Sequence, residues 1–600
     1  MKKMFTKFYC KRWFALITLV FFLGSPVASW ACTSIVVGKD ASTTGKVLIA
    51  RTADADPTLS ARFIIHEAGR FKKGVKYTLD PTNGFEFTFS HDSYRYTAVP
   101  MTTISYRNFI VGTDMPLDQV AKYYESFEQS GVNEKGLTVS ATNTTGFRAG
   151  ISDFNPQTGE ATGIDPAGKW MEQTITTVLL AECATAQEAL RVIGEIVETQ
   201  GMDNSLLMFA DKDEAWIAEA LSGHRWVATR VPDDSFAVIS NATVTDRLPA
   251  DPAHYRISVD YKEFAEGANS EDLKIAVYHA DGSLNIARTF GRMLADDGTP
   301  KTIRDVNGSY NSYRRWRGYS MFAPSLELKP LTNEDMDVYK LYVRPDRKIS
   351  PTDVMNFQRD RYNGVKDVPG VKDLEYSPQY LDPDTGREIN EANAGLEIRS
   401  IGYYNQLFTH VFEAGWKDPD IGARFWISMG AAESSVNIPF YGNITDTHPF
   451  YKKDIKLAED NVYQPDSAFW LFADTGILAR GNRKQYAKPI KDYWRAYELK
   501  MYDDLAAAET EMMKLHQTDP KAAAKYITDY TLQVSDRTFK KAEEIHDALV
   551  EHIELRSGDL FVVPADTENK ESSSGCDAGM SVFALLFVVC AYGLREKKRI

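Results

Sequence analysis

The strongest constraint on this chain is the position of Cys32, which directly follows an N-terminal segment with the pattern of a cleaved leader. Residues 1–31 begin with basic residues, continue with an apolar run from Trp13 to Leu23, and end in Ser29-Trp30-Ala31. A basic start, a short apolar core and small residues at the −3 and −1 positions are typical of a secretory signal peptide. An uncleaved anchor is the alternative, but the apolar run is short for a bilayer, which needs about 20 residues. We predict cleavage after Ala31, which makes Cys32 the first residue of the mature chain.

A second apolar segment lies near the other end of the chain. Residues 580–594 are apolar, follow a motif of small residues, and precede the basic residues of 595–599. This order resembles bacterial C-terminal sorting tails, and a plain tail anchor with its basic end in the cytoplasm is the alternative. Both interpretations predict an exported protein, in the cell envelope or at the cell surface, that is membrane-associated through its tail. Whether the tail is later removed stays open.

The size, charge and motif content exclude several classes of protein. A chain of 600 residues is too long for one hydrophobic core, so we expect at least two packed units. The net charge of −14 argues against nucleic acid or an anionic membrane surface as a partner, since both need clustered lysine and arginine. The sequence has no G-x-S-x-G elbow, H-E-x-x-H pair, P-loop or dinucleotide-binding glycine pattern. We therefore expect no metal and no cofactor.

The cysteines and histidines of the predicted mature body are few. Cys32 and Cys183 are its two cysteines, too few for a disulfide scaffold. A bridge between them is possible, but Cys183 lies in an apolar helical stretch, which favours a buried thiol. His546 and His552 share a predicted helix at a spacing of six, which does not direct both at one ligand. We expect this pair to be solvated.

Alternation of apolar residues predicts strands in the first half of the chain. Residues 33–37 and 47–51 are β-branched and apolar and are joined by a turn-rich segment, which predicts a hairpin that starts at Cys32. Two helical segments, 170–183 and 186–199, separate further strand-like segments. The further predicted strands are 137–141, 206–210, 215–220, 226–229 and 236–239. Hairpins with an inserted helical pair indicate a layered α+β unit.

The second half of the chain has a different pattern. Ser350-Pro351-Thr-Asp353 is a typical helix start, and two long amphipathic helices are predicted over 490–516 and 521–555. We divide the chain into a signal peptide (1–31), a catalytic domain (32–330), a helix-rich C-terminal part (331–565), and a linker with a sorting or transmembrane tail (566–600).

A cysteine at a mature N-terminus has two chemical uses. Lipid attachment is one, but the bulky Trp30 and the absence of an aliphatic residue at −3 disfavour it. The other is catalysis through the cysteine's own α-amine, whose pKa of about 7.7–8.0 leaves much of it neutral near physiological pH. Such an amine can take the thiol proton, so that the thiolate attacks a carbonyl without help from a histidine.

Several motifs then appear in a definite order along the chain. The segment Cys32-Thr-Ser-Ile-Val-Val-Gly is followed by Arg51-Thr-Ala-Asp54, then by Asn133-Glu-Lys-Gly-Leu with Asn143 at the end of the same segment. Ile239-Ser-Asn241 and the arginine segment Tyr310-Asn-Ser-Tyr-Arg-Arg-Trp-Arg317 come later. Together they resemble the dipeptidases of peptidase family C69, which are N-terminal-nucleophile hydrolases related to the penicillin V and conjugated bile acid acylases. The resemblance covers nearly all of residues 32–555.

The resemblance implies a fold, an activity and a set of site residues. It implies an N-terminal-nucleophile hydrolase fold, a four-layer αββα sandwich, with a helix-rich C-terminal region. It also implies an exported cysteine dipeptidase that hydrolyses short peptides through a thioester on Cys32. Asp54 would hold the α-amine with Arg51 nearby, Asn143 and Asn241 would stabilise the oxyanion, and one arginine of 314, 315 and 317 would face the site. We favour Arg315.

Two other functions remain compatible with the same sequence. The same catalytic residues serve acylases of the superfamily that cleave non-peptide amides. The chain could also be a surface-anchored binding protein on an inactive scaffold. The sequence does not indicate the side-chain preference or the oligomeric state.

Overall fold

A computed structural model describes most of the chain between Cys32 and Asp566. The described residues are 32–55, 59–80, 84–103, 127–144, 146–148, 150–154, 161–169, 172–267, 275–291, 311–330, 339–366, 368, 371, 373–375, 380–381, 388–389, 399–416, 421–455, 462–556 and 558–566. The predicted signal peptide and the apolar tail segment lie outside this part of the chain.

The predicted N-terminal hairpin forms the middle of one sheet. Ser34 on the first strand lies opposite Arg51 on the second, and every residue of both strands is buried. The sheet continues on both sides of this hairpin, and all its strands pair antiparallel. Its order is β14 (Phe236–Ile239), β1 (Thr33–Val37), β2 (Val47–Asp54), β18 (Gln406–Ala414), β19 (Arg424–Met429) and β20 (Ile438–Tyr441).

Half of this sheet comes from the part of the chain described above as helix-rich. Strands β18–β20 lie beyond the proposed boundary at residue 330, yet β18 pairs along the whole of β2. The described residues from Cys32 to Val563 belong to one compact unit, which extends across that boundary. The strands were missed because they are buried on both faces and carry buried polar residues such as His410 and Glu413. A strand buried on both faces shows no apolar–polar alternation.

The second sheet contains most of the strands predicted in the first half of the chain. Its antiparallel pairs join segments that are mostly close in sequence. Its order is β15 (Tyr255–Ile257), β13 (Arg225–Arg230), β12 (Ala215–Ser222), β11 (Ser205–Ala210), β8 (Thr138–Asn143), β7 (Glu128–Asn133), β6 (Tyr96–Pro100) and β3 (Ile64–His66). A small hairpin, β4 (Lys76–Asp80) with β5 (Phe85–Thr88), lies apart from it.

Two predicted helices cover one face of the second sheet. They are α4 (Glu172–Glu182) and α5 (Ala186–Gln200), and they pack with it around one apolar core. The apolar positions of α5 recur at helical spacing and are buried, which is the pattern of a helix packed on a sheet. Thr185 caps this helix by accepting a hydrogen bond from the backbone N–H of Glu188.

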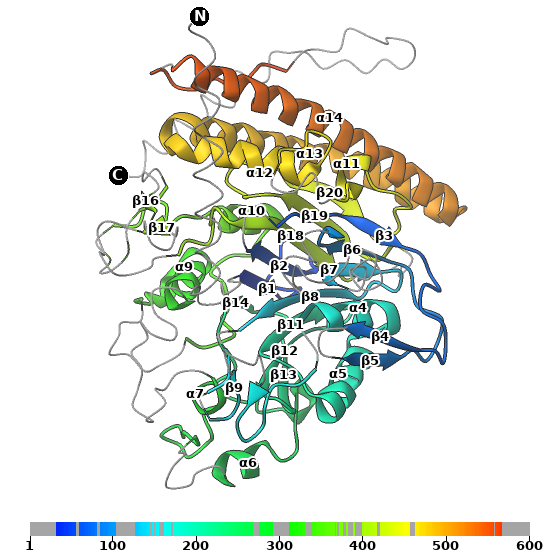
Figure 1. The fold of residues 1–600 in the computed structure, drawn as a ribbon, viewed down its shortest axis with the longest axis vertical. Helices are drawn as coiled ribbons and strands as arrows, with labels where there is room; N and C mark the ends of the chain where they lie inside the picture. Colours follow the sequence, from blue (N-terminus) through cyan, green and yellow to red (C-terminus); the bar gives the residue numbers. More distant parts are fainter. Residues whose placement is uncertain are drawn as a thin grey trace, which may run out of the picture. The chain divides into compact units, whose positions relative to one another are not determined.

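The opposite face of the second sheet packs on the first sheet, with β2 against β8 and β11. A second group of helices covers the outer face of the first sheet (Figure 1). These are α9 (Tyr313–Phe322), α10 (Pro351–Gln358), α12 (Ala468–Ala479), α13 (Lys488–His516) and α14 (Pro520–Glu554). The layers are therefore helix, sheet, sheet, helix, which confirms the predicted α+β sandwich with a helix-rich C-terminal region.

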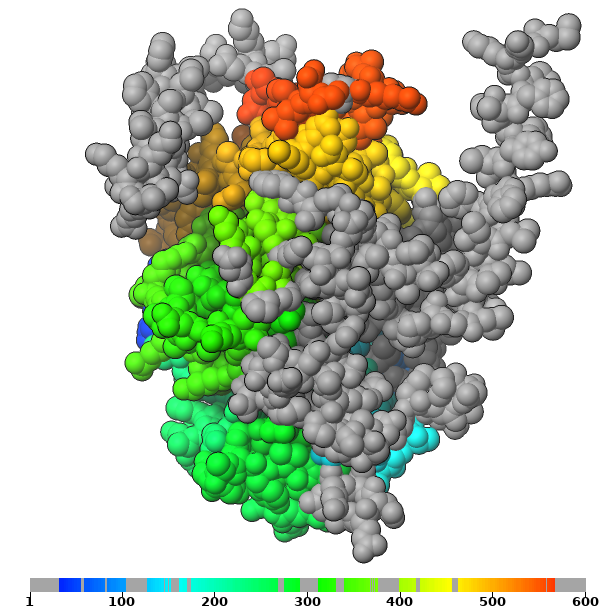
Figure 2. Space-filling model, turned by 90° about the vertical axis from the view of Figure 1, so that its left-hand side faces the viewer, coloured from blue at the N-terminus to red at the C-terminus, as the bar shows by residue number. Residues whose placement is uncertain are grey.

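The long helices begin as the sequence predicts. Ser350 and Asp353 form a reciprocal capping box at the start of α10, and Asp519 caps α14 just before Pro520. Residues of α12, α13 and α14, yellow to orange, gather at one end of the unit in both views (Figures 1 and 2). Among the helices that the structure describes, none combines the length and the apolar character needed to cross a bilayer.

His546 corrects one expectation. Its ring is buried between α14 and α12 and hydrogen-bonds to Asp474 at 2.9 Å and to Asp547 at 3.1 Å, so it is not a solvated residue. Burial acts to lower the pKa of His546, but the two carboxylates outweigh it and the pKa is raised. The protonated ring therefore helps to hold α14 against α12.

The stability of the protein should depend on pH through His546. A histidine with a raised pKa contributes stability that is fully present below its ordinary pKa of about 6.5 and is lost as the pH rises through the raised value. We expect the melting temperature of His546→Gln to fall below that of the wild type most strongly at about pH 6, with a smaller difference at about pH 9. Asp474→Asn should show the same loss of the pH-dependent part of the melting temperature. A wild-type-to-variant difference that is constant across this range would contradict the role of the ring charge.

Candidate active site

Cys32 lies at the start of β1, on the face of the first sheet that packs against the second. Extended residues two apart point the same way, so Cys32 shares a face with Ser34, which lies opposite Arg51. Arg51 reaches the second sheet, where its guanidinium donates to the carbonyl of Gln129 at 3.2 Å. The cysteine is 1% exposed, so its thiol is enclosed by the two sheets.

Arg51 is the hydrogen-bond partner of the thiol. Its Nη2 donates to Sγ of Cys32 at 3.1 Å, and the side chain is fully buried. The backbone beneath Arg51 is held by Gln358, whose amide donates to the carbonyls of Arg51 and His410. A guanidinium at this distance is placed to donate to a sulfur that carries negative charge.

No histidine hydrogen-bonds to Cys32 in the described part of the chain. His410 lies opposite Arg51 on the neighbouring strand, and its pKa is far below the ordinary value because of its burial and the Arg51 charge. A ring held neutral in this way, without a hydrogen bond to the thiol, is not placed as the general base of Cys32. The base must come from another group.

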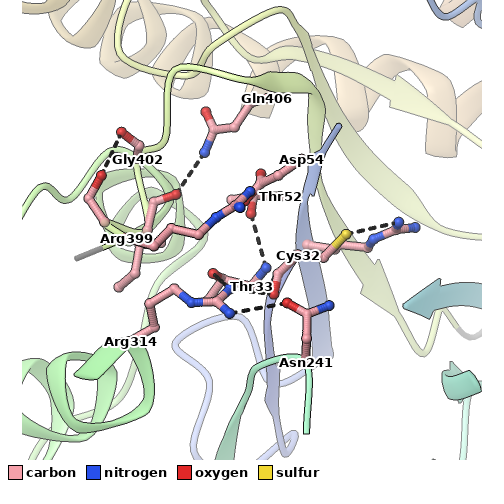
Figure 3. A network of polar contacts seen from close by, with 12 residues as sticks. Cys32, Thr33, Thr52, Asp54, Asn241, Arg314, Arg399, Gly402 and Gln406 are labelled. Atoms are coloured by element: carbon pink, nitrogen blue, oxygen red, sulfur yellow. Dashed lines mark hydrogen bonds and ion pairs between the residues drawn. The ribbon is translucent and has the colours of Figure 1, made fainter. Parts of the chain in front are cut away.

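Asp54 lies at the end of β2, beside Cys32 (Figure 3). Its Oδ2 forms an ion pair with Nη2 of Arg399 at 3.0 Å, and its Oδ1 has no hydrogen-bond partner among the described residues. Burial raises the pKa of Asp54, while Arg399, Arg314 and the Thr52 side chain act in the opposite direction. Asp54 is therefore a buried carboxylate that depends on neighbouring positive charge.

Asn143 and Asn241 meet across the two sheets. Asn143 ends β8, and Asn241 follows β14; Nδ2 of Asn241 donates to the carbonyl of Asn143 at 2.6 Å. The side chain of Asn143 accepts a hydrogen bond from Asn204. Both predicted oxyanion residues are thus joined to each other.

Arg314, and not Arg315, faces the cysteine (Figure 3). Nη1 of Arg314 donates to the carbonyl of Cys32 at 2.6 Å and to the hydroxyl of Thr33 at 2.8 Å, and Nη2 donates to Oδ1 of Asn241 at 3.1 Å. One fully buried guanidinium therefore connects the cysteine backbone to Asn241.

The expectation for Arg315 is wrong for a simple reason of helix geometry. Both residues lie in the first turn of α9, where successive side chains are rotated by about 100°. Arg315 therefore points elsewhere, donating to the carbonyls of Val238 and Tyr339, and Arg317 pairs with Asp360. Without the packing of α9, the sequence could not tell which arginine turns toward the cysteine.

The structure thus brings together five of the predicted site residues, Cys32, Arg51, Asp54, Asn143 and Asn241, with Arg314 in place of Arg315. Arg399 was not predicted at all. It is separated from Asp54 by 345 residues, and no motif in the sequence marks it. Only the pairing of β18 with β2 brings its segment to the site.

Cys183 does not take part in the site. Both described cysteines are free, so the possible bridge between them is not formed. Burial holds the pKa of Cys183 well above the ordinary value. Within the described residues, no group of three or more His, Cys, Asp and Glu side chains is placed to hold a metal ion.

The four-layer αββα sandwich, with a cysteine at the start of a central strand, is the architecture of the N-terminal-nucleophile hydrolases. Within that class the chain belongs to peptidase family C69, whose sequence model matches residues 31–496. The match begins one residue before Cys32 and extends beyond β20 into α13. Membership of this family supports a peptidase function.

Curated relatives are similar over most of their length. Probable dipeptidase B of Streptococcus pyogenes serotype M1 is 26% identical over 530 residues, which cover 87% of this chain and 93% of that protein. Dipeptidase A of Lactobacillus helveticus is 25% identical over 469 residues, covering 76% of this chain and 83% of that protein. Among solved structures, penicillin V acylase from Agrobacterium tumefaciens matches at 12% identity with a TM-score of 0.27, covering 68% of this chain and 86% of that one.

The adjacent arginines of α9 provide a matched test of the site. We expect Arg314→Lys to lower kcat/KM for a cleaved peptide on the order of 100-fold, because lysine cannot hold the Cys32 carbonyl and Asn241 together and small displacements of catalytic groups are costly. Arg315→Lys should lose thermal stability but keep kcat/KM near that of the wild type. The two variants are compared by steady-state kinetics. Thermal melts give the folded fraction of each variant, to which its kcat/KM is normalised. Equal losses of activity would contradict the assignment of Arg314.

Proposed function

We propose that this protein is an exported cysteine dipeptidase that uses Cys32, freed by removal of the leader, as an N-terminal nucleophile. The observation that carries the proposal is the pairing of the buried Cys32 thiol with the guanidinium of Arg51 at 3.1 Å. Its place at the start of β1, one residue after the family match begins, supports a processed N-terminus at this position.

The proposed reaction begins with proton transfer inside Cys32. The α-amine, with a pKa of about 7.7–8.0 before any perturbation, accepts the thiol proton. Arg51 stabilises the resulting thiolate, and Asp54 holds the ammonium through the oxygen that Arg399 leaves available. The thiolate then attacks the carbonyl carbon of the scissile peptide bond.

Different residues stabilise the oxyanion and protonate the leaving group. The side-chain amide N–H of Asn241 and the backbone N–H of Asn143 would donate to the negative oxygen of the tetrahedral intermediate. The carbon–nitrogen bond then breaks, and the leaving amine takes the proton from the α-ammonium, which leaves a thioester on Cys32. Water attacks the thioester, passes a proton to the thiolate through the α-amine, and releases the carboxylic acid.

The substrate class follows from the relatives. The similar proteins are described as dipeptidases, and the two quoted above are covered over more than four-fifths of their length. We therefore propose dipeptides as substrates. Amides with a non-peptide acyl group, which the same chemistry could cleave, are an outcome that the test separates.

The nucleophile is tested by measuring amino-acid release from a panel of dipeptides. The full chain, exported and shown by intact mass to begin at Cys32, should release amino acids, and Cys32→Ala should show only the uncatalysed background. Cys183→Ala is the matched control, because its thiol is buried within the helical layer, and it should keep wild-type kcat/KM.

The outcomes of this test differ clearly. Turnover by Cys32→Ala would overturn the nucleophile. Turnover of acylated amines without any of dipeptides, abolished by Cys32→Ala, would keep the nucleophile and overturn the substrate class. No turnover of either kind by the processed wild type would overturn the enzymatic proposal and favour a binding role.

The α-amine is tested separately from the thiol. Acetylation at mildly acidic pH modifies the α-amine ahead of the more basic lysines, and hydroxylamine then frees any acetylated thiol. We expect kcat/KM to fall by about 100-fold to 10,000-fold, the usual contribution of a general acid–base group, with the thiol content unchanged. Unchanged turnover after verified acetylation would refute the amine as the base.

We also propose export with retention at the membrane through residues 566–600. The basic and apolar pattern of residues 1–31 and the apolar segment 580–594 support it. Deleting residues 566–600 should move the protein from the membrane fraction to the soluble fraction without loss of peptidase activity. A full-length protein found in the cytoplasmic fraction with its leader intact would contradict the proposal.

A further inference from the structure

Arg399 forms a buried ion pair with Asp54 that the catalytic steps above do not explain. Nη2 of Arg399 lies 3.0 Å from Oδ2 of Asp54, with 7% of the arginine side chain and none of the aspartate side chain exposed. The pair uses one carboxylate oxygen and leaves Oδ1, which has no hydrogen-bond partner among the described residues. The arginine thus fixes how the carboxylate is turned.

Arg399 is itself held firmly. Its guanidinium lies 3.9 Å from the centre of the Tyr403 ring, a cation–π contact, and its carbonyl accepts a hydrogen bond from the hydroxyl of Tyr362. Gln406 donates to the carbonyl of Ile401 and lies opposite Asp54 in the pairing of β18 with β2. The segment that carries Arg399 is therefore hydrogen-bonded to Gln406, the residue that lies opposite Asp54.

The charges around Asp54 come from two separate parts of the chain. Arg399 faces it from the segment before β18, and Arg314 acts on it from α9, while Thr52 is its neighbour on β2. Burial raises the pKa of Asp54 and these three groups oppose that change. A carboxylate holds an ammonium group more strongly than a protonated carboxyl does, and the two arginines favour the charged form of Asp54.

We propose that Arg399 is a positioning residue for the nucleophile: it keeps Asp54 ionised and turned so that its second oxygen binds the α-amine of Cys32. This inference rests on the proposed function of Cys32. Arg399 acts through Asp54, and Asp54 acts on the amine that moves the proton.

The role predicts a particular pH signature. Removing a positive charge raises the pKa of every nearby group, so the carboxyl, the thiol and the amine all shift in the same direction. In Arg399→Met, the acid limb of kcat/KM should move to higher pH by about one to three units, the usual effect of an opposite charge on a carboxyl. Arg399→Lys, which keeps the charge but loses the planar geometry, should show a smaller shift.

A second readout does not depend on turnover. The rate at which iodoacetamide alkylates Cys32 reports the thiolate, and peptide mapping by mass spectrometry separates this label from any on Cys576 and Cys590 of the tail. Cys183 is buried with a raised pKa and should stay unmodified. The pH profile of this rate should move upward in Arg399→Met in parallel with the kinetic profile. The processed full-length chain is used throughout.

Arg424 provides the matched control. It forms a buried ion pair with Glu413, which lies opposite Leu48 near the start of β2, whereas Asp54 lies at its end. Arg424→Met, which removes a buried positive charge as Arg399→Met does, should lower the melting temperature without moving either pH profile. The comparison separates loss of a buried ion pair from loss of a charge beside Asp54.

The outcomes distinguish this proposal from the proposed function. Upward shifts in Arg399→Met, smaller in Arg399→Lys and absent in Arg424→Met, support it. Profiles of Arg399→Met that match the wild type, with only a lower melting temperature, would overturn it and make the pair structural. If the wild type cleaves no dipeptide, the proposed function fails, and the alkylation profile still decides the role of Arg399.

Discussion

Three guanidinium groups are buried around Cys32, and the cost of burying them constrains the rest of the core. Arg51, Arg314 and Arg399 are each less than 8% exposed. A buried charge is tolerated only with an opposite charge or with several hydrogen bonds, and loss of one partner of a buried pair costs about 3–5 kcal/mol. Here the acceptors are the Cys32 thiol and carbonyl, a carbonyl of the facing sheet, Asn241 and Asp54. Three of the groups that accept from the arginines, the Cys32 thiol, Asn241 and Asp54, are therefore also groups proposed for catalysis.

This arrangement links stability to function through the layers. Arg51 spans the space between the two sheets, Arg314 reaches in from a helix of the outer layer, and Arg399 arrives with the strand β18. Each arginine thus belongs to a different part of the fold, and the site is complete only when the two sheets and helix α9 have packed together. The cysteine is enclosed as a consequence, and electrostatic interactions are stronger in such an enclosed site than in water.

Local sequence patterns predicted the helices and strands whose apolar residues recur at a regular spacing. The first hairpin, the helices α4 and α5, and the two long C-terminal helices lie within a few residues of their predicted ranges, since their apolar periodicity reflects a single buried face. Strands β18–β20 escaped prediction because both of their faces are buried. The motifs that resemble those of the family grouped Cys32 with Arg51, Asp54, Asn143 and Asn241, and this grouping stays a prediction of their roles. The prediction failed for Arg315, whose direction depends on the rotation of α9.

The sequence by itself determined that a cysteine opens the first strand, that an Arg-x-x-Asp motif follows on the second, and that the chain is a layered α+β protein. Those features are local, or are carried by short motifs. Only the tertiary structure decided that Arg314 faces Cys32, that residues beyond 400 complete the central sheet, and that Arg399 pairs with Asp54. These contacts join residues that are hundreds of positions apart, so they exist only after strand pairing and helix packing have fixed the direction of each side chain.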